Sequence, residues 1–419
     1  MTTIASTLVQ RVRPCFLPLA VAAVGGVGFL VSWAAGSWLL AALTIASLGV
    51  AGGVCWFLRR RRVRPRSESS AGEPAVKEEV RSRARRAENA ADESEDLIEE
   101  MLRQGRYALL LRPQIVGNLN EPQVRNALED LEAAMALTPE GTVLLRTWRA
   151  TAEHDGDPSD DHVMRVEAFY LDRYPVTNRE YLRFVEAGGY EQMSLWDPDI
   201  WSGILDFVDR SGAPGPGEWE NGRYAPGRDD HPVVGVSWYE AAAYARWVGK
   251  RLPTDAEWVK AASWPVGNGG GRPMQRKYPW GDAMDHTFAN LWATQIGDTL
   301  PVSKLEEGVS VGGVYQLIGN VWEWTHSNFG AWDEAAKRLE IQGAMKSIRG
   351  GAFDTYFDSQ ATCQFQSGDS SIARKHNIGF RCCLGLCDLA PNFAEDWSAP
   401  GAAQSEGVEN ETGALEAAV

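Results

Sequence analysis

The N-terminal part of this 419-residue chain contains a long run, from Cys15 to Leu58, that carries no charged residue. As a single helix this run would be about 66 Å long at ~1.5 Å per residue. A bilayer core is about 30 Å thick, so the run fits two transmembrane helices better than one. We place the turn near residues 33–38, where Trp33 and Trp38 would lie at the membrane interface. The alternative is a cleavable signal peptide, whose apolar core is only about 7–15 residues long.

Positive charges flank both ends of this run. Arg11 and Arg13 precede it, an arginine-rich block follows at 59–66, and the connecting turn has no Lys or Arg. The positive-inside rule then places residues 1–14 and everything after the second helix in the cytoplasm. The sequence therefore predicts an integral membrane protein, anchored through residues 15–58, with its soluble part on the cytoplasmic side.

The overall charge and the cysteines limit the classes of partner. The formal net charge is −15, whereas a phosphate-binding surface needs a basic excess, so we expect no nucleic-acid partner. The six cysteines include no CxxC pair, and we expect neither a disulfide framework nor a zinc site. Unpaired cysteines fit a reducing compartment such as the cytoplasm.

The rest of the chain divides into a charged linker (59–94), a helical neck (95–140), a main domain (155–390) and an acidic, disordered tail (391–419). In the neck, apolar residues recur at helical spacing from Leu97 to Leu109, and Pro113 ends that run. The pattern returns after Asn120 and continues to Met135. We expect short helices that pack on each other or on the main domain.

The main domain combines a few helices with much irregular β structure, which is an α+β composition. Residues 162–172 alternate as a strand does. Capping boxes, in which two residues satisfy free helix N–H groups, predict three helix starts: Thr177 with Glu180, Ser237 with Glu240, and Thr254 with Glu257. After Ala262 the chain is rich in Gly, Pro and Trp, which indicates short strands and loops.

Six motifs occur in one order between residues 163 and 385: FYLDRYPVTNREYLRFV, HPVVGVSWYEAAAYARWVGKRLPTDAEWVKAA, YPWGD, GVYQLIGNVWEWT, IRGGAF and NIGFRC. Together they resemble the sulfatase-modifying factor family, which comprises the formylglycine-generating enzyme and its relatives. The resemblance implies one compact α+β domain with a variant C-type-lectin fold and little regular secondary structure. The hairpin, the neck and the tail lie outside it.

The resemblance also implies where a redox metal would bind. The family's oxidases hold copper with two cysteines after the Gly-Gly turn, and that spacing falls here on Thr355 and Gln360. Copper(I) prefers thiolates, and Cys363 lies three residues beyond the second position without a partner thiol. A second branch of the family binds iron through histidines, but no two histidines here are spaced i, i+4. We expect neither copper nor iron.

A structural calcium is the metal that the resemblance does imply. The matching positions are Gln316, Gly319, Val321 and Glu323, of which Gln316 stands where Asn or Asp is usual. A carboxylate and two backbone carbonyls would supply half of a calcium shell. The alternative is that Glu323 caps the chain or forms a salt bridge.

The family's ligand groove is the candidate binding site. Trp322 and Asn377 match groove positions by resemblance, although Trp322 could equally pack in the core. The loop after the glycine turn adds the further candidates Phe353, Thr355, Tyr356, Phe357, Gln360 and Cys363. We expect Arg349 and Arg381, in contrast, to brace the fold through buried hydrogen bonds.

Three functions remain open from the sequence, the third being cofactor-free catalysis on a small peptide. The first is a membrane-anchored, non-catalytic domain, a pseudoenzyme without copper-dependent oxidase activity that binds a peptide or protein. The second is an oxidoreductase of the formylglycine-generating type that modifies a protein or peptide through a non-standard site. The missing cysteine pair favours the first.

Overall fold

The computed structural model describes residues 93–146, 161–266, 273–329 and 345–394. The predicted hairpin at 15–58, most of the charged linker and nearly all of the acidic tail lie outside these residues. Within the described part of the chain, no helix combines the length and the apolarity that a membrane crossing requires.

The neck is helical, with two differences from the prediction. Residues 93–103 are helical, followed by α3 (Tyr107–Leu110), α4 (Pro113–Val116) and α5 (Glu121–Ala134). The first helix ends before Leu109 because the chain turns at Gly105, which has a φ of +75°. Glycine adopts this left-handed conformation more easily than other residues. Pro113 does not end a helix but begins α4, since proline fits the first helical turn.

The end of the neck belongs to a sheet. The helical pattern continued to Met135, but α5 ends at Ala134 and β1 (Met135–Thr138) begins there. β1 pairs antiparallel with β4 (Phe169–Asp172), which pairs in turn with β9 (Cys383–Gly385). A separate two-stranded sheet joins β2 (Gly141–Arg146) to β3 (Asp161–Val166). The predicted strand at 162–172 is thus β3 and β4 in succession.

The three predicted capping boxes are confirmed. They open α6 (Asn178–Glu186), α7 (Trp238–Trp247) and α8 (Asp255–Ser263). At α7, for example, the Ser237 hydroxyl accepts the Glu240 N–H at 3.2 Å and the Glu240 carboxylate accepts the Ser237 N–H at 2.7 Å. Each box satisfies two of the free N–H groups at its helix start.

A four-stranded sheet carries the site-bearing loops. Its order is β7 (Gln366–Ser370), β6 (Met345–Arg349), β5 (Trp322–Asn328) and β8 (Ile378–Phe380). β5 and β8 run parallel, whereas the other pairs are antiparallel. The loops contain the 3₁₀ helices η3 (Met193–Leu195), η4 (Pro198–Asp206), η5 (Trp292–Thr294), η6 (Glu306–Gly308), η7 (Asp358–Gln360) and η8 (Leu386–Asp388), and α9 (Pro391–Ala394) follows.

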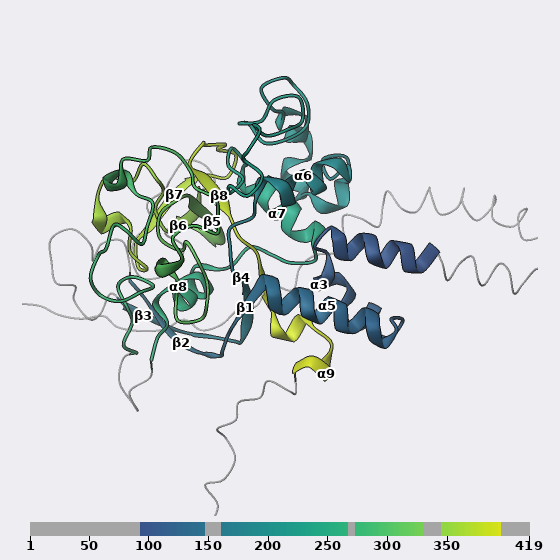
Figure 1. The fold of residues 1–419 in the computed structure, drawn as a ribbon, viewed down its shortest axis with the longest axis horizontal. Coiled ribbons are helices and arrows are strands. Elements are labelled where there is room, and N and C mark those ends of the chain that lie inside the picture. The colour runs from purple at the N-terminus through teal and green to yellow at the C-terminus, as the bar shows by residue number, and fades with distance from the viewer. Residues whose placement is uncertain (1–92, 147–160, 267–272, 330–344, 395–419) are drawn as a thin grey trace, which may run out of the picture. The chain divides into compact units, whose positions relative to one another are not determined.

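Three apolar clusters connect these layers. Aromatic rings of α6 and α7, such as Tyr181 and Trp247, form one cluster, and Trp258 of α8 belongs to a second. α8 contacts β2, β3, β5 and β6, and so it lies between the two-stranded and the four-stranded sheets (Figure 1). In the third cluster, Leu131 of α5 packs with Leu384 of β9, which confirms that the neck packs on the main domain.

Candidate functional site

The loop from 349 to 363, here called the glycine-turn loop, begins with two glycines in the left-handed region. Gly350 has φ +99° and Gly351 has φ +81°, a conformation that side chains disfavour. A Cβ at Gly350 would also lie 2.6 Å from the carbonyl oxygen of Leu317. On the N-terminal side, the fully buried Arg349 donates to the carboxylate of Asp255 at 2.8 Å and anchors the turn. The glycine-turn loop therefore begins at a turn that is held rigidly in place.

The positions that would hold copper carry no thiol, and the donor set does not fit the metal. The Thr355 hydroxyl accepts the Ala352 N–H at 2.8 Å, so it stabilises the turn. Gln360 ends the short helix η7 and is half-buried. The Cys363 thiol is fully buried, and burial raises its pKa, which disfavours the thiolate that copper(I) prefers.

The same loop exposes aromatic rings. The side chains of Tyr356 and Phe357 are 66% and 60% exposed. Tyr356 lies 6.2 Å from the ring of Trp292, which is itself half exposed, and 5.1 Å from the ring of Phe357. The loop thus presents a connected and mostly exposed aromatic surface.

Of the two predicted groove residues, Trp322 is in the core and Asn377 is close to the loop. Trp322 belongs to the buried aromatic cluster, and its ring lies 6.1 Å from the ring of Phe365. This is the arrangement expected if Trp322 packs in the core. The Asn377 amide donates to both carboxylate oxygens of Asp354 in the glycine-turn loop, at 3.0 and 3.1 Å. Its own side-chain oxygen is buried and has no hydrogen-bond partner among the residues that the structure describes.

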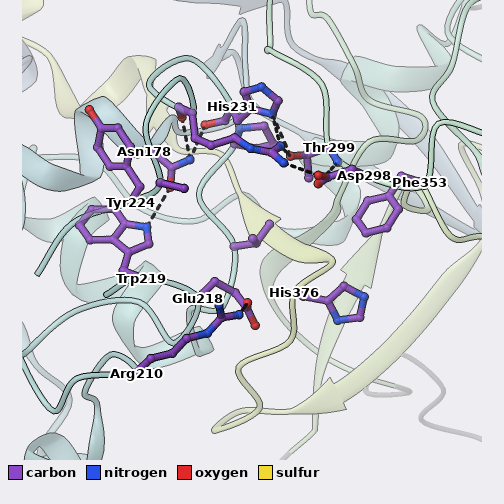
Figure 2. Close-up of a pocket in the computed structure, with 15 residues that line it drawn as sticks. Asn178, Arg210, Glu218, Trp219, Tyr224, His231, Asp298, Thr299, Phe353 and His376 are labelled. Carbon is purple, nitrogen blue, oxygen red and sulfur yellow. Dashed lines mark hydrogen bonds and ion pairs between the residues drawn. The ribbon is translucent and has the colours of Figure 1, made fainter. Parts of the chain in front are cut away.

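A pocket of about 350 Å³ opens beside this loop. Figure 2 shows Phe353 and His376 on one side of the pocket, with Trp219 and Tyr224 opposite. The Phe353 and His376 rings lie 5.8 Å apart and form one wall of the pocket. Because Phe353 belongs to the glycine-turn loop, this wall is continuous with the loop. Asn178 fixes the far wall, because its side-chain oxygen accepts the Trp219 indole N–H at 3.0 Å.

Two ion pairs lie among the residues that line the pocket. Arg210 pairs with Glu218, and Arg228 pairs with Asp298. Arg228 also contacts the Nδ1 atom of His231 at 3.0 Å. Burial, together with the Arg228 charge, lowers the pKa of His231, so this imidazole is neutral at physiological pH. The pocket therefore offers hydrogen-bonding groups whose charges are already balanced.

The predicted calcium residues have protein partners in this structure. Glu323 is 1% exposed, and its two carboxylate oxygens accept N–H groups of Arg381 at 2.7 and 2.8 Å. The Trp258 indole N–H also donates to Glu323, at 2.8 Å. Gln316 donates to two backbone carbonyls and accepts from Asn320. Because the buried guanidinium of Arg381 neutralises Glu323 and binds both of its oxygens, this set with Gly319 and Val321 does not fit calcium.

The histidines do not gather either. His376 lies at the pocket, whereas His326 packs against the ring of Trp238. Among the described residues, no three His, Cys, Asp or Glu side chains form a group that could hold a metal ion.

Most pocket residues were not predicted from the sequence. Asn178 begins α6, and Asp298 lies in the loop after η5. The others lie in the segment between η4 and α7: Arg210, Trp219, Tyr224 and Arg228. Only Phe353 was among the predicted site residues. A signal was available at Asn178, because a buried asparagine directly after a capping threonine needs a partner for its amide.

Comparison with known proteins agrees with this description. Residues 121–386 match the model of the sulfatase-modifying factor enzyme 1-like domain. Serine/threonine-protein kinase pkn1 of Chlamydia caviae is 30% identical over 71% of this chain and 46% of that protein. Hercynine oxygenase of Mycobacterium tuberculosis is 40% identical over 46% of this chain and 47% of that protein. Formylglycine-generating enzyme of Thermomonospora curvata is 30% identical over 62% of this chain and 95% of that protein.

The chain spans about half the length of the kinase and oxygenase relatives that it matches. It covers the formylglycine-generating relative almost completely, and the α+β architecture is consistent with a variant C-type-lectin fold. Since the family model matches more than half of the residues, this chain belongs to the family of sulfatase-modifying factor enzyme 1-like domains.

Proposed function

We propose that this chain is a membrane-anchored domain that binds a peptide or protein segment and does not carry out copper-dependent oxidation. The observation that carries the proposal is the glycine-turn loop, which buries its thiol and exposes the rings of Tyr356 and Phe357. Aromatic side chains are enriched among the residues that dominate binding energy at protein interfaces. A solvent-exposed pair next to a pocket is therefore better suited to recognition than to redox chemistry.

The pocket beside the loop would receive part of the ligand. Its volume of about 350 Å³ is within the range of ligand sites, ~300–1,000 Å³. Phe353 supplies an apolar wall, and the paired charges of Arg228 and Asp298 supply donors and acceptors without a net charge. This combination favours an apolar side chain flanked by peptide groups, which are polar but neutral.

The anchor is proposed from the uncharged run at 15–58 and the arginines around it. A reporter fused after Val419 should then be active in the cytoplasm. Reporter activity on the other side of the membrane would contradict the two-helix arrangement.

Binding can be tested with the full chain in detergent and a displayed library of random peptides. Enriched peptides should bind the Tyr356→Ala/Phe357→Ala double variant at least about tenfold more weakly, which is about 1.4 kcal/mol. Leu205→Ala is the matched control, since Leu205 is 87% exposed and lies in η4, outside the loop. Failure to enrich any peptide, or equal binding to the double variant, would contradict the proposal.

The oxidoreductase alternative has a separate test. Metal analysis of the purified full chain should find no stoichiometric copper, because the only thiol in the glycine-turn loop is buried. Copper that is present at one equivalent and is lost in Cys363→Ser would favour the alternative.

A further inference from the structure

Three exposed aromatic residues, here called the ring cluster, lie where the loop at 290–299 meets the glycine-turn loop. They are Trp292, Tyr356 and Phe357, which are 49%, 66% and 60% exposed. The Tyr356 ring lies 6.2 Å from the Trp292 ring, and the Trp292 N–H donates to the Thr355 carbonyl at 3.2 Å. Contiguous exposed rings of this kind indicate an interaction surface more than a single exposed ring does.

One buried residue holds the two loops in a fixed relation. Asn320 is 1% exposed, and its side-chain oxygen accepts the Leu300 N–H at 2.8 Å and an amide N–H of Asn290 at 3.1 Å. Its backbone carbonyl accepts the Phe353 N–H at 3.1 Å. Because both loops are hydrogen-bonded to Asn320, the ring cluster is preorganised, and little affinity is lost to ordering these loops when a ligand binds.

The ring cluster is continuous with the pocket described above. The same two loops reach that pocket, since Asp298 lies six residues after Trp292 and Phe353 lies three residues before Tyr356. Both Asp298 and Phe353 line the pocket (Figure 2). A peptide that places an apolar side chain in the pocket therefore presents its neighbouring residues to the rings.

The ring cluster lies among carboxylates that no Lys or Arg neutralises. Asp354 and Asp358 flank Tyr356 and Phe357 in sequence, and residues 282–297 add two aspartates, with no Lys or Arg in 282–297 or in 352–363. Among the described residues, the ion pairs of Asp354 and Asp358 are only with histidines: His376 at 3.8 Å and His286 at 3.0 Å. A cation at this surface would be attracted by the ring faces and by the carboxylates, whereas an anion would be repelled.

We propose that the peptide ligand carries a lysine or arginine side chain that lies over the ring cluster. This inference rests on the proposed function and adds the class of ligand: a segment with an apolar residue for the pocket and a basic residue close to it. A cation within about 6 Å of a ring centroid is attracted by the negative face of the ring. The long alkyl part of Lys or Arg covers apolar surface while its charged end stays in water, which suits rings that are themselves half exposed.

The peptide selection with the full chain tests this class of ligand. Enriched peptides should carry Lys or Arg at a fixed spacing from an apolar residue. Replacing that Arg by citrulline, or that Lys by norleucine, removes the charge at nearly constant length and should weaken binding about fivefold. Failure to enrich any peptide would contradict the proposed function and this inference together. Enriched peptides without a basic position, or equal binding of the neutral peptide, would overturn this inference alone.

Two variants of the full chain locate the cation. Tyr356→Leu/Phe357→Leu keeps apolar surface but removes two rings, and Asp354→Asn/Asp358→Asn removes two charges. In each, the fivefold preference for the charged peptide should fall to about twofold, because the rings and the carboxylates both contribute to it.

The matched control is Glu121→Gln/Glu186→Gln, which removes two charges from exposed ion pairs outside both loops. The control should keep the full preference for the charged peptide. An unchanged preference in either loop variant would overturn the proposal. An equal fall in the control would also overturn it, since that result would show attraction to the whole acidic chain rather than to the ring cluster.

Discussion

The pair formed by Glu323 and Arg381 offers a sharp test of how the domain is held together. Both side chains are at most 1% exposed, and three N–H groups converge on the carboxylate, two from Arg381 and one from Trp258, at 2.7–2.8 Å. Glu323→Gln keeps the shape of the side chain. It removes the negative charge, however, and turns an NH₂ group toward one or more of the three donors.

The expected loss is large. Removing one partner of a buried ion pair costs about 3–5 kcal/mol, since the remaining charge stays buried. Arg381 cannot escape to solvent, because it also donates to the backbone carbonyls of Asp172, Arg173 and Tyr315. A domain of ordinary stability has only about 5–15 kcal/mol in total. Urea unfolding of the full chain in detergent, followed by tryptophan fluorescence, should therefore show a large shift of the midpoint.

The control is Glu140→Gln, which breaks the exposed pair with Arg165 and should cost no more than about 1 kcal/mol. A loss below about 1 kcal/mol for Glu323→Gln would refute the reasoning. The same samples test the calcium prediction. We expect a chelator to leave the wild-type midpoint unchanged, whereas a calcium ligand at Glu323 would make the wild type, but not the variant, sensitive to it.

Three further outcomes are expected. Tyr356→Ala/Phe357→Ala should change the free energy of unfolding by less than about 0.5 kcal/mol, because both rings are mostly exposed. A larger change in thermal unfolding would contradict this exposure. Native alkylation read by mass spectrometry should modify the exposed Cys387 before Cys363, since burial raises the pKa of the Cys363 thiol; equal rates would contradict its burial. Lys260→Met should flatten the pH dependence of stability. Burial lowers the Lys260 pKa to about 8 in the folded chain, below the ordinary value near 10.4, so the unfolded chain binds more protons between these values and wild-type stability should rise there with pH. An identical slope in urea unfolding of both proteins would contradict this.

The features predicted best from the sequence are those that depend on nearby residues or on a buried charged side chain. The three capping boxes formed as expected, because each joins residues only three positions apart. Arg349 and Arg381 brace the fold as predicted, since an arginine next to a glycine turn or in a buried, mostly apolar stretch needs buried acceptors.

The sequence could not predict what depends on distant partners. β1 reads as the continuation of α5 up to Met135, and only its pairing with β4 makes it a strand. The Arg228–Asp298 pair at the pocket joins loops 70 residues apart, and neither loop carries a local pattern that indicates the other.

The position of β4 has a consequence for the synthesis of the protein. Its two neighbours in the sheet are β1 at the start of the domain and β9 at its end. β8, an edge strand of the four-stranded sheet, and Arg381, which neutralises Glu323, also lie in the last residues of the domain. A nascent chain that has not yet released residues 378–385 lacks one edge strand of the three-stranded sheet and one of the four-stranded sheet, and its Glu323 has no arginine partner. We therefore expect the domain to fold late and cooperatively after translation, and a premature stop before Ile378 to yield a chain that is degraded rather than one that is partly active.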